Sequence, residues 1–250
     1  MKPQHTMYSG LHITAIIPAL NEEDAIGQVV SDLLKLKDNE GLTIIDQVIV
    51  GDNGSTDKTA HIAENAGALV IFEPKKGYGA ACQAALKHID KTDIVVFVDG
   101  DCSIVVGQTL TLLEALADGA DLVIGSRVKG YIEPGAMSWP QHIGNGLIAG
   151  IIAKLWQAKV TDLGPFRAIR YQALLSLGMQ DQTYGWTVEM QAKALQHHLI
   201  MSEVPVDCRV RIGQSKVSGT IRGVIGAAYG MLSMVFKLRW QESINKPKLL

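Results

Sequence analysis

Five short apolar runs alternate with helical segments between residues 10 and 126, and this alternation constrains the fold more than any other feature of the chain. Uninterrupted apolar runs rich in β-branched residues are typical of strands buried on both faces of a parallel sheet. Because helical spacing follows each run, we predict an α/β fold whose doubly wound, mostly parallel sheet carries helices on both faces. The runs occupy residues 13–17, 48–50, 69–72, 95–98 and 122–124.

After residue 127 the regular alternation stops. The composition indicates a loop at 131–140, a turn at 162–167 that precedes a helix, and a basic loop at 209–216. Helices are expected at 143–156, from about 184 to 198 and at 220–240, with a short strand at 199–206. No linker-like segment separates the two parts, so we predict a single domain over 1–250 that ends in an apolar, amphipathic helix at 221–240.

The composition narrows the function classes. A formal net charge of −2 argues against a nucleic-acid partner. Cys82, Cys102 and Cys208 are far apart and form no disulfide or zinc motif, so we expect a reducing, cytoplasmic location. The polar N-terminus shows no signal-peptide stretch. The longest mainly apolar run without a charge, at 223–236, is shorter than the roughly 20 residues of a spanning helix.

Two carboxylates, Asp99 and Asp101, directly follow the apolar run at 95–98, with Gly100 between them. Open α/β sheets bind ligands at the carboxyl ends of their strands. In extended backbone both acids face the same way, and Gly100 leaves space for a bulky anion. Two hard oxygen donors suit Mg²⁺ or Mn²⁺ holding a diphosphate. The alternative is a strand-ending turn, in which Asp and Gly are common.

Other polar residues are expected at the same edge of the sheet. Asp52 ends the second strand, where its carboxylate could accept a hydrogen bond from a nucleobase or merely order the following turn. Arg127 ends the fifth strand and is a candidate for phosphate binding. Arg209, Arg211 and Lys216 place three cations within eight residues. Such a loop can close over a diphosphate, although a solvated basic turn is the alternative.

Several motifs, taken in order, resemble those of glycosyltransferase family 2. They lie at 17–23, 52–57, 76–79, 99–101, 125–127, 166–168 and 213–216. The similarity covers about residues 12–220 and is strongest to the branch that contains dolichyl-phosphate mannose synthase and bacterial polyprenyl-phosphate sugar synthases. The resemblance implies a GT-A fold, a nucleotide-diphosphate sugar donor, Mg²⁺ or Mn²⁺ as cofactor, and inversion at the anomeric carbon.

The resemblance also implies roles for individual residues. The nucleoside site would be lined by Pro18, Leu20, Glu22 and Asp52, the metal and diphosphate would be held by Asp99, Gly100 and Asp101, and phosphates would be met by Arg127, Arg167 and Lys216. Residues 10–126 would form a nucleotide-sugar-binding half and 127–220 an acceptor half. Ser103 stands where the mannose-donor enzymes carry glutamine, so the sugar stays open. Arg209 and Arg211 both fit the arginine of the closing loop.

We hypothesise that the acceptor is a polyprenyl phosphate, met by a peripherally bound protein at the cytosolic face of a membrane. The apolar stretches 144–152 and 223–236 motivate this, and the second is flanked by Arg222, Lys237 and Arg239. A phosphate monoester is already anionic and needs no general base, whereas a hydroxyl acceptor would need one, for which Glu189 is the candidate catalytic residue. The alternatives are a hydroxyl acceptor, a nucleotide-sugar-binding protein without turnover, and apolar helices that pack together or in a homo-oligomer.

Overall fold

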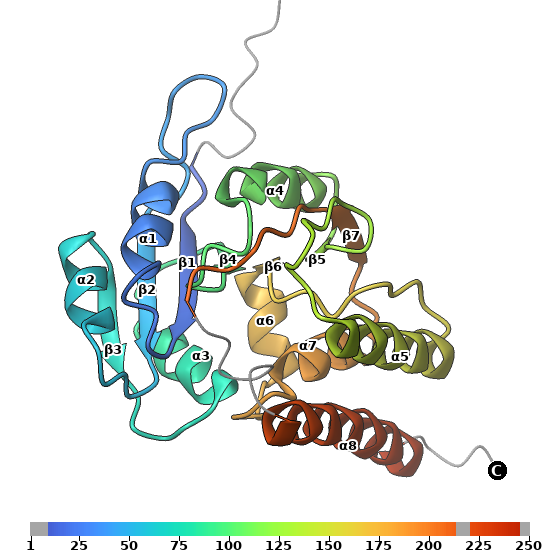
Figure 1. The fold of residues 1–250 in the computed structure, drawn as a ribbon. Helices are drawn as coiled ribbons and strands as arrows, with labels where there is room; N and C mark the ends of the chain where they lie inside the picture. The colour runs from blue at the N-terminus through green and yellow to red at the C-terminus, as the bar shows by residue number, and fades with distance from the viewer. Residues whose placement is uncertain (1–9, 214–220, 246–250) are drawn as a thin grey trace, which may run out of the picture.

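The computed structural model describes residues 10–213 and 221–245. Seven strands in these ranges form one sheet, in the order β3-β2-β1-β4-β6-β5-β7 (Figure 1). The five strands expected in the first half are present, and the strand expected at 199–206 is β7. The strands are β1 (Ile13–Ala19), β2 (Gln47–Asp52), β3 (Leu69–Phe72), β4 (Ile94–Phe97), β5 (Leu122–Ser126), β6 (Arg167–Arg170) and β7 (Met201–Pro205).

The strand β6 was not predicted, and it lies inside the sheet. It pairs antiparallel with β4 on one side and β5 on the other, whereas the remaining strand pairs are parallel. The sequence indicated only a turn before a helix, because the segment Arg-Ala-Ile-Arg has just two apolar residues. Tertiary contacts make it a strand: Ala168 and Ile169 are fully buried in the hydrophobic clusters on opposite faces of the sheet.

Helices cover both faces of the sheet, as the doubly wound prediction requires. On β4, Val96 packs into the cluster formed with the helices of one face, and Val95 and Phe97 pack into the cluster of the other. The Phe97 ring meets Trp186 edge-on, with the ring centroids 6.2 Å apart. One face carries α1 (Ile26–Leu34), α2 (Thr59–Asn65), η1 (Val106–Gln108) and α4 (Thr109–Ala117), and the other carries α3 (Tyr78–Leu86), α6 (Tyr171–Leu177) and α7 (Trp186–Gln196).

Two longer helices, α5 (Trp139–Trp156) and α8 (Ile221–Asn245), pack against α7 through a third hydrophobic cluster and lie beside each other in Figure 1. The helix expected at 221–240 is therefore present. It does not divide into one apolar and one polar face, because Val235 and Leu238 are buried while Phe236 and Trp240 are exposed. Among the residues described, no helix combines the length and apolar character needed to cross a bilayer.

Candidate active site

A cavity of about 230 Å³ lies at the carboxyl edge of the sheet, where β1 and β4 end and α3 begins. Because β1, β2 and β4 are parallel neighbours, their carboxyl ends meet there, as expected from the sequence. We call this cavity the carboxylate pocket. The predicted site residues that line it are Pro18, Leu20, Glu22, Asp99, Gly100, Asp101 and Arg211.

The two central acids differ in their surroundings. Burial, reinforced by the neighbouring charge of Asp101, raises the pKa of the Asp99 carboxyl to about 6. The Tyr78 hydroxyl donates a hydrogen bond to Asp99 Oδ1 over 3.3 Å. Asp101 Oδ1 accepts a hydrogen bond of 3.0 Å from the Ser103 backbone N–H, and its other oxygen faces Arg211.

Arg211 joins two carboxylates of this pocket. Its Nη2 lies 3.0 Å from Glu22 Oε1 and 3.2 Å from Asp101 Oδ2. The Ile212 backbone N–H donates to the Asp101 carbonyl, which holds this segment against the end of β4. The Arg209 side chain is exposed, and its backbone N–H donates to the Ser103 carbonyl. The structure thus distinguishes Arg209 from Arg211, which the sequence could not do. Lys216 lies outside the described residues.

The arrangement of the acids defines what kind of metal site this pocket can be. Within 10–213 and 221–245, no three or more His, Cys, Asp or Glu residues are placed to hold a metal ion by themselves. Mg²⁺ is commonly bound by one or two carboxylates together with substrate phosphates and water. Asp99 and Asp101 fit that mode, because they supply hard oxygen donors at a cavity that is open to a ligand. A cation here would need the phosphates of a substrate to complete its coordination.

One side of the carboxylate pocket is built by residues that the sequence analysis did not single out. Asn53 Oδ1 accepts the Gly77 backbone N–H at 2.7 Å, and its amide donates to the Lys75 carbonyl at 2.7 Å. Lys76 Nζ donates to the carbonyls of Asn53 and Gly54, at 3.0 and 2.9 Å. The motif at 76–79 could have indicated this wall of the pocket. Nothing in the neighbouring sequence indicates that Asn53 holds the segment 75–77 in place.

Asp52, the predicted nucleobase ligand, does not line this pocket. It is only 3% exposed, and its Oδ1 accepts the Ser55 backbone N–H at 3.1 Å. The carboxylate thus orders the turn after β2, which was the alternative role. Asn53, the next residue, takes the place at the pocket wall.

The glycines Gly77 and Gly79 allow two backbone segments to meet at the entrance to α3. The Gly79 and Ala80 N–H groups donate to the carbonyls of Thr183 and Gln182, at 3.2 and 3.0 Å. A Cβ atom on Gly79 would lie 2.2 Å from the Asp181 carbonyl oxygen, and one on Gly77 would be closer still to Gln182. Only glycine permits this close approach, and through it the segment before α7 lies at the carboxylate pocket.

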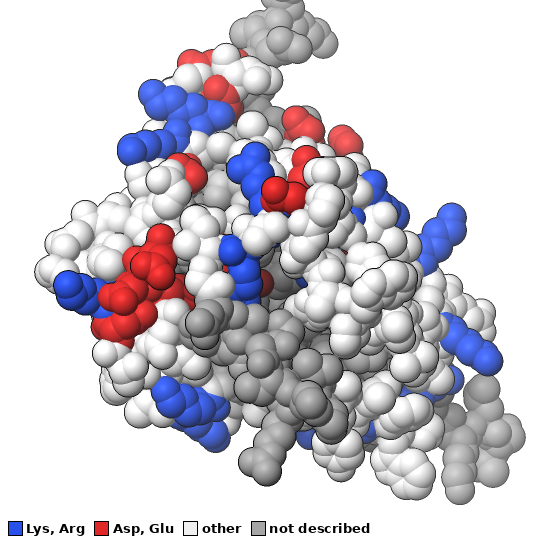
Figure 2. All heavy atoms as spheres, in the orientation of Figure 1, with Lys and Arg blue, Asp and Glu red and all other residues white. Residues whose placement is uncertain are grey.

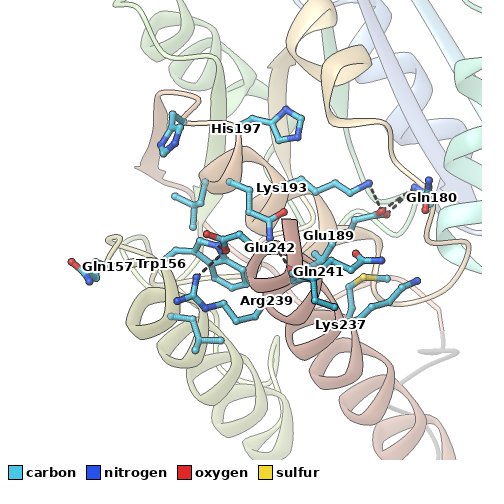
Figure 3. A pocket seen from close by; sticks show the side chains of 17 residues that line it. Trp156, Gln157, Gln180, Glu189, Lys193, His197, Lys237, Arg239, Gln241 and Glu242 are labelled. Carbon is cyan, nitrogen blue, oxygen red and sulfur yellow. Dashed lines mark hydrogen bonds and ion pairs between the residues drawn. The ribbon is translucent and has the colours of Figure 1, made fainter. Parts of the chain in front are cut away.

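Glu189, the candidate catalytic base, does not line the carboxylate pocket. It is 2% exposed and lines a separate cavity of about 990 Å³ between α7 and α8 (Figure 3). Its carboxylate accepts the backbone N–H groups of Gln180 and Asp181, the latter at 2.7 Å, and pairs with Lys193 Nζ at 2.8 Å. Through these bonds Glu189 holds the segment before α7.

Arg167, which was predicted to meet phosphates, does not line the carboxylate pocket either. The side chain is 1% exposed, and its guanidinium donates to the backbone carbonyls of Leu163, Gly164 and Thr187. Burial lowers the pKa of the guanidinium to about 10. Arg167 therefore fixes the connection from the turn at 162–166 to β6 and points into the protein.

Arg127 lines a second cavity of about 280 Å³, which we call the apolar pocket. The Asp162 carboxylate accepts hydrogen bonds from Arg127 Nε at 3.0 Å and from Arg127 Nη2 at 2.7 Å. These two bonds orient the guanidinium. Burial disfavours the charge of Arg127, but Asp162 outweighs this and raises the pKa of the guanidinium. Tyr78 and Tyr184 line both the apolar pocket and the carboxylate pocket. The other walls come mainly from α5 and α8, with Gly144, Asn145, Ile148, Ala227, Ala228 and Met231.

A comparison with protein families agrees with this geometry. The sequence model described as Glycosyl transferase family 2 matches residues 14–178. The chain belongs to this family. The resemblance inferred from the motifs is confirmed, and the protein is a glycosyltransferase.

Individual relatives support the same family. An uncharacterized glycosyltransferase of Mycobacterium tuberculosis is 34% identical over 220 residues, which cover 87% of this chain and 94% of the relative. The dolichyl-phosphate hexose transferase of Haloferax volcanii is 31% identical over 85% of this chain and 89% of its own. Glucosyl-3-phosphoglycerate synthase from Mycobacterium tuberculosis, solved with Mg²⁺ and UDP, aligns with a TM-score of 0.74 at 21% identity, over 94% of this chain and 81% of that one. This structural likeness confirms the predicted GT-A fold.

Proposed function

We propose that this glycosyltransferase is an inverting, metal-dependent enzyme that moves a hexosyl group from a nucleotide-diphosphate sugar to a polyprenyl phosphate. The observation that carries the proposal is the pairing of two adjoining pockets, one lined by acids and one apolar with a single oriented arginine. The name of the Haloferax relative, a dolichyl-phosphate hexose transferase, supports this acceptor class. The UDP and Mg²⁺ in the solved relative support the donor and the cofactor.

The carboxylate pocket is suited to the leaving diphosphate. A divalent cation held by Asp99 and Asp101 would neutralise the negative charge that develops there, which is the usual catalytic use of such an ion. Arg211 supplies a fixed positive charge beside Asp101 and Glu22. Pro18, Leu20 and Asn53 line the part of the pocket left for the nucleoside.

The apolar pocket is suited to a lipid phosphate. Arg127 provides a charge-assisted donor for the phosphate, and Asp162 keeps the guanidinium in one orientation. The small and aliphatic residues of α5 and α8 would contact the first part of the isoprenoid chain. A phosphate monoester with a second pKa near 6 attacks without a general base. The engagement of Glu189 elsewhere therefore favours this acceptor over a hydroxyl group.

The outer faces of α5 and α8 give the proposed enzyme a route to the membrane. Both helices expose large apolar side chains at helical spacing, and α5 contains no acidic residue. Figure 2 shows mainly uncharged and basic side chains over this lower right part of the molecule. Such a face suits an anionic membrane surface. The exposed side chains are Trp139, Ile143 and Leu147 on α5, and Tyr229, Phe236, Trp240 and Ile244 on α8.

A transfer assay tests the proposed acceptor. Purified protein with Mg²⁺ or Mn²⁺ is given radiolabelled UDP-glucose or GDP-mannose together with decaprenyl phosphate, decaprenol or 3-phosphoglycerate. We expect labelled lipid only with decaprenyl phosphate, and no product in excess chelator. Transfer to decaprenol or phosphoglycerate but not to the lipid phosphate would reject the acceptor. Donor binding without any transfer would favour the non-catalytic alternative.

Two variants sharpen the acceptor test. Arg127→Gln should raise the KM for decaprenyl phosphate about 10- to 150-fold, the worth of one charge-assisted hydrogen bond. Lys129→Gln is the matched control, because Lys129 is nearby but half exposed and paired with Glu203 at 3.0 Å. Equal effects of both substitutions would show that Arg127 does not bind the phosphate.

Vesicle flotation tests the membrane face separately. Trp240→Ser and Ile143→Ser should reduce binding to vesicles of phosphatidylglycerol and phosphatidylcholine. Leu175→Ser is the control, since Leu175 is 55% exposed but lies on α6. A gel-filtration shift to monomer in the first two variants, without a change in vesicle binding, would instead assign the face to a homo-oligomer.

A further inference from the structure

Two tyrosines form the boundary between the carboxylate pocket and the apolar pocket. Tyr78 is the first residue of α3, and Tyr184 lies two residues before α7. Both line both cavities. Tyr78 is half-buried and Tyr184 is 37% exposed, so each ring has one part in the protein and another facing the cavities.

The positions of the two rings are coupled through the backbone. The segment 181–183 is hydrogen-bonded to the start of α3 through the N–H groups of Gly79 and Ala80. At its other side the Glu189 carboxylate accepts the N–H groups of Gln180 and Asp181. Residues 106 positions apart in the chain are thus held on adjoining, closely packed segments, and the wall they form is preorganised.

The geometry of inversion places the transferred sugar at this wall. The anomeric carbon loses its bond to the diphosphate oxygen on one side while it gains a bond to the acceptor oxygen on the other. The leaving diphosphate belongs to the pocket of Asp99 and Asp101, and the attacking phosphate belongs beside Arg127. The sugar ring between them must therefore lie against the side chains that the two cavities share.

Tyrosine has the chemistry to bind a pyranose, because its ring packs on apolar C–H groups while its hydroxyl forms hydrogen bonds. Tyr78 has a defined hydroxyl direction through its bond of 3.3 Å to Asp99.

We propose that Tyr78 and Tyr184 form the subsite for the transferred hexose, in which the Tyr78 hydroxyl contacts a hydroxyl group of the sugar and the Tyr184 ring packs against the pyranose. This inference rests on the proposed donor site and on an acceptor that binds beside Arg127, whatever the chemical identity of that acceptor. It predicts that both tyrosines act on the sugar part of the donor and leave nucleotide binding unchanged.

Calorimetry without acceptor tests the subsite. The dissociation constants of UDP and UDP-glucose, and of GDP and GDP-mannose, are measured with Mg²⁺ for the wild type, Tyr78→Phe, Tyr184→Ala and Tyr184→Phe. Tyr131→Phe is the control, because Tyr131 is 63% exposed and lines neither pocket. We expect Tyr78→Phe and Tyr184→Ala to weaken the nucleotide sugar about 3- to 10-fold, the worth of one hydrogen bond or ring contact. Free UDP or GDP should change by less than twofold.

The possible outcomes separate this inference from the proposed function. Equal weakening of the nucleotide and the nucleotide sugar would place the tyrosines at the nucleotide, and no change in either would remove them from the site; both results overturn the subsite. Tyr184→Phe keeps the ring and should retain affinity for the nucleotide sugar. If it does, the weaker binding of Tyr184→Ala comes from the lost ring contact. Failure of the wild type to bind any of the four ligands would overturn the donor site itself. A wrong acceptor would leave these binding results unaltered.

Discussion

Replacement of Glu189 by glutamine separates a chemical role of this residue from a positional one. Oε2 accepts the Asp181 N–H at 2.7 Å, and the Gln180 N–H donates to both oxygens, at 3.0 Å to Oε1 and 3.1 Å to Oε2. Oε1 also lies 2.8 Å from Lys193 Nζ. Glutamine keeps one oxygen but places an amide N–H group where the second oxygen accepted its bonds. The Glu189 and Lys193 side chains are 2% and 14% exposed, so solvent screens their interaction little.

The expected result is a loss of stability with little loss of chemistry. One lost hydrogen bond to a charged group costs about 1.5–3 kcal/mol. For a chain of this size each kcal/mol lowers Tm by about 2–4 °C, so Tm should fall by about 3–12 °C. At 25 °C the variant should still transfer sugar within about tenfold of the wild-type rate, whereas removal of a general base costs about 10²–10⁴-fold.

Scanning calorimetry and steady-state transfer from UDP-glucose or GDP-mannose to decaprenyl phosphate measure the two effects. Glu114→Gln, on the exposed side of α4, controls for the loss of one carboxylate. A fall of more than 10²-fold in kcat at unchanged Tm would refute the positional role and restore Glu189 as a catalytic base. It would also remove the chemical argument for a phosphate acceptor.

Three further predictions concern the pockets and the packing beside them. Asp101→Asn should abolish Mg²⁺-dependent nucleotide binding in calorimetry and lower transfer by at least about 10²-fold, with an unchanged circular dichroism spectrum. Arg211→Gln should lower kcat/KM about 10- to 150-fold, while Arg209→Gln stays within twofold; equal losses would contradict the assignment of Arg211. Gly79→Ala should destabilise the protein by at least about 1–3 kcal/mol in urea unfolding, because its Cβ would meet Asp181. Gly150→Ala, whose Cβ would meet nothing within 4 Å, should be neutral or stabilising.

The sequence alone determined the features that depend on local periodicity and short motifs. Short apolar runs indicate strands, so the first five strands and the doubly wound layer were predicted correctly, although β3 lies at the edge of the sheet with Leu69 and Phe72 exposed. The acids Asp99 and Asp101 could be placed at a sheet edge because they directly follow a buried strand. The family, too, could be identified, since its motifs are short, ordered segments.

Only the tertiary structure decided which distant residues meet. β6 has no periodic signal of its own and is a strand only because β4 and β5 supply its hydrogen bonds. Arg211 and Arg209 have the same chemistry, yet one reaches Glu22, 189 residues away, and the other is exposed. Glu189 and Arg167 were predicted as site residues, and only the folded chain shows that their side chains form hydrogen bonds with backbone groups outside the carboxylate pocket. Side-chain partners depend on the three-dimensional path of the whole chain, and a residue's type and its neighbours in sequence do not specify that path.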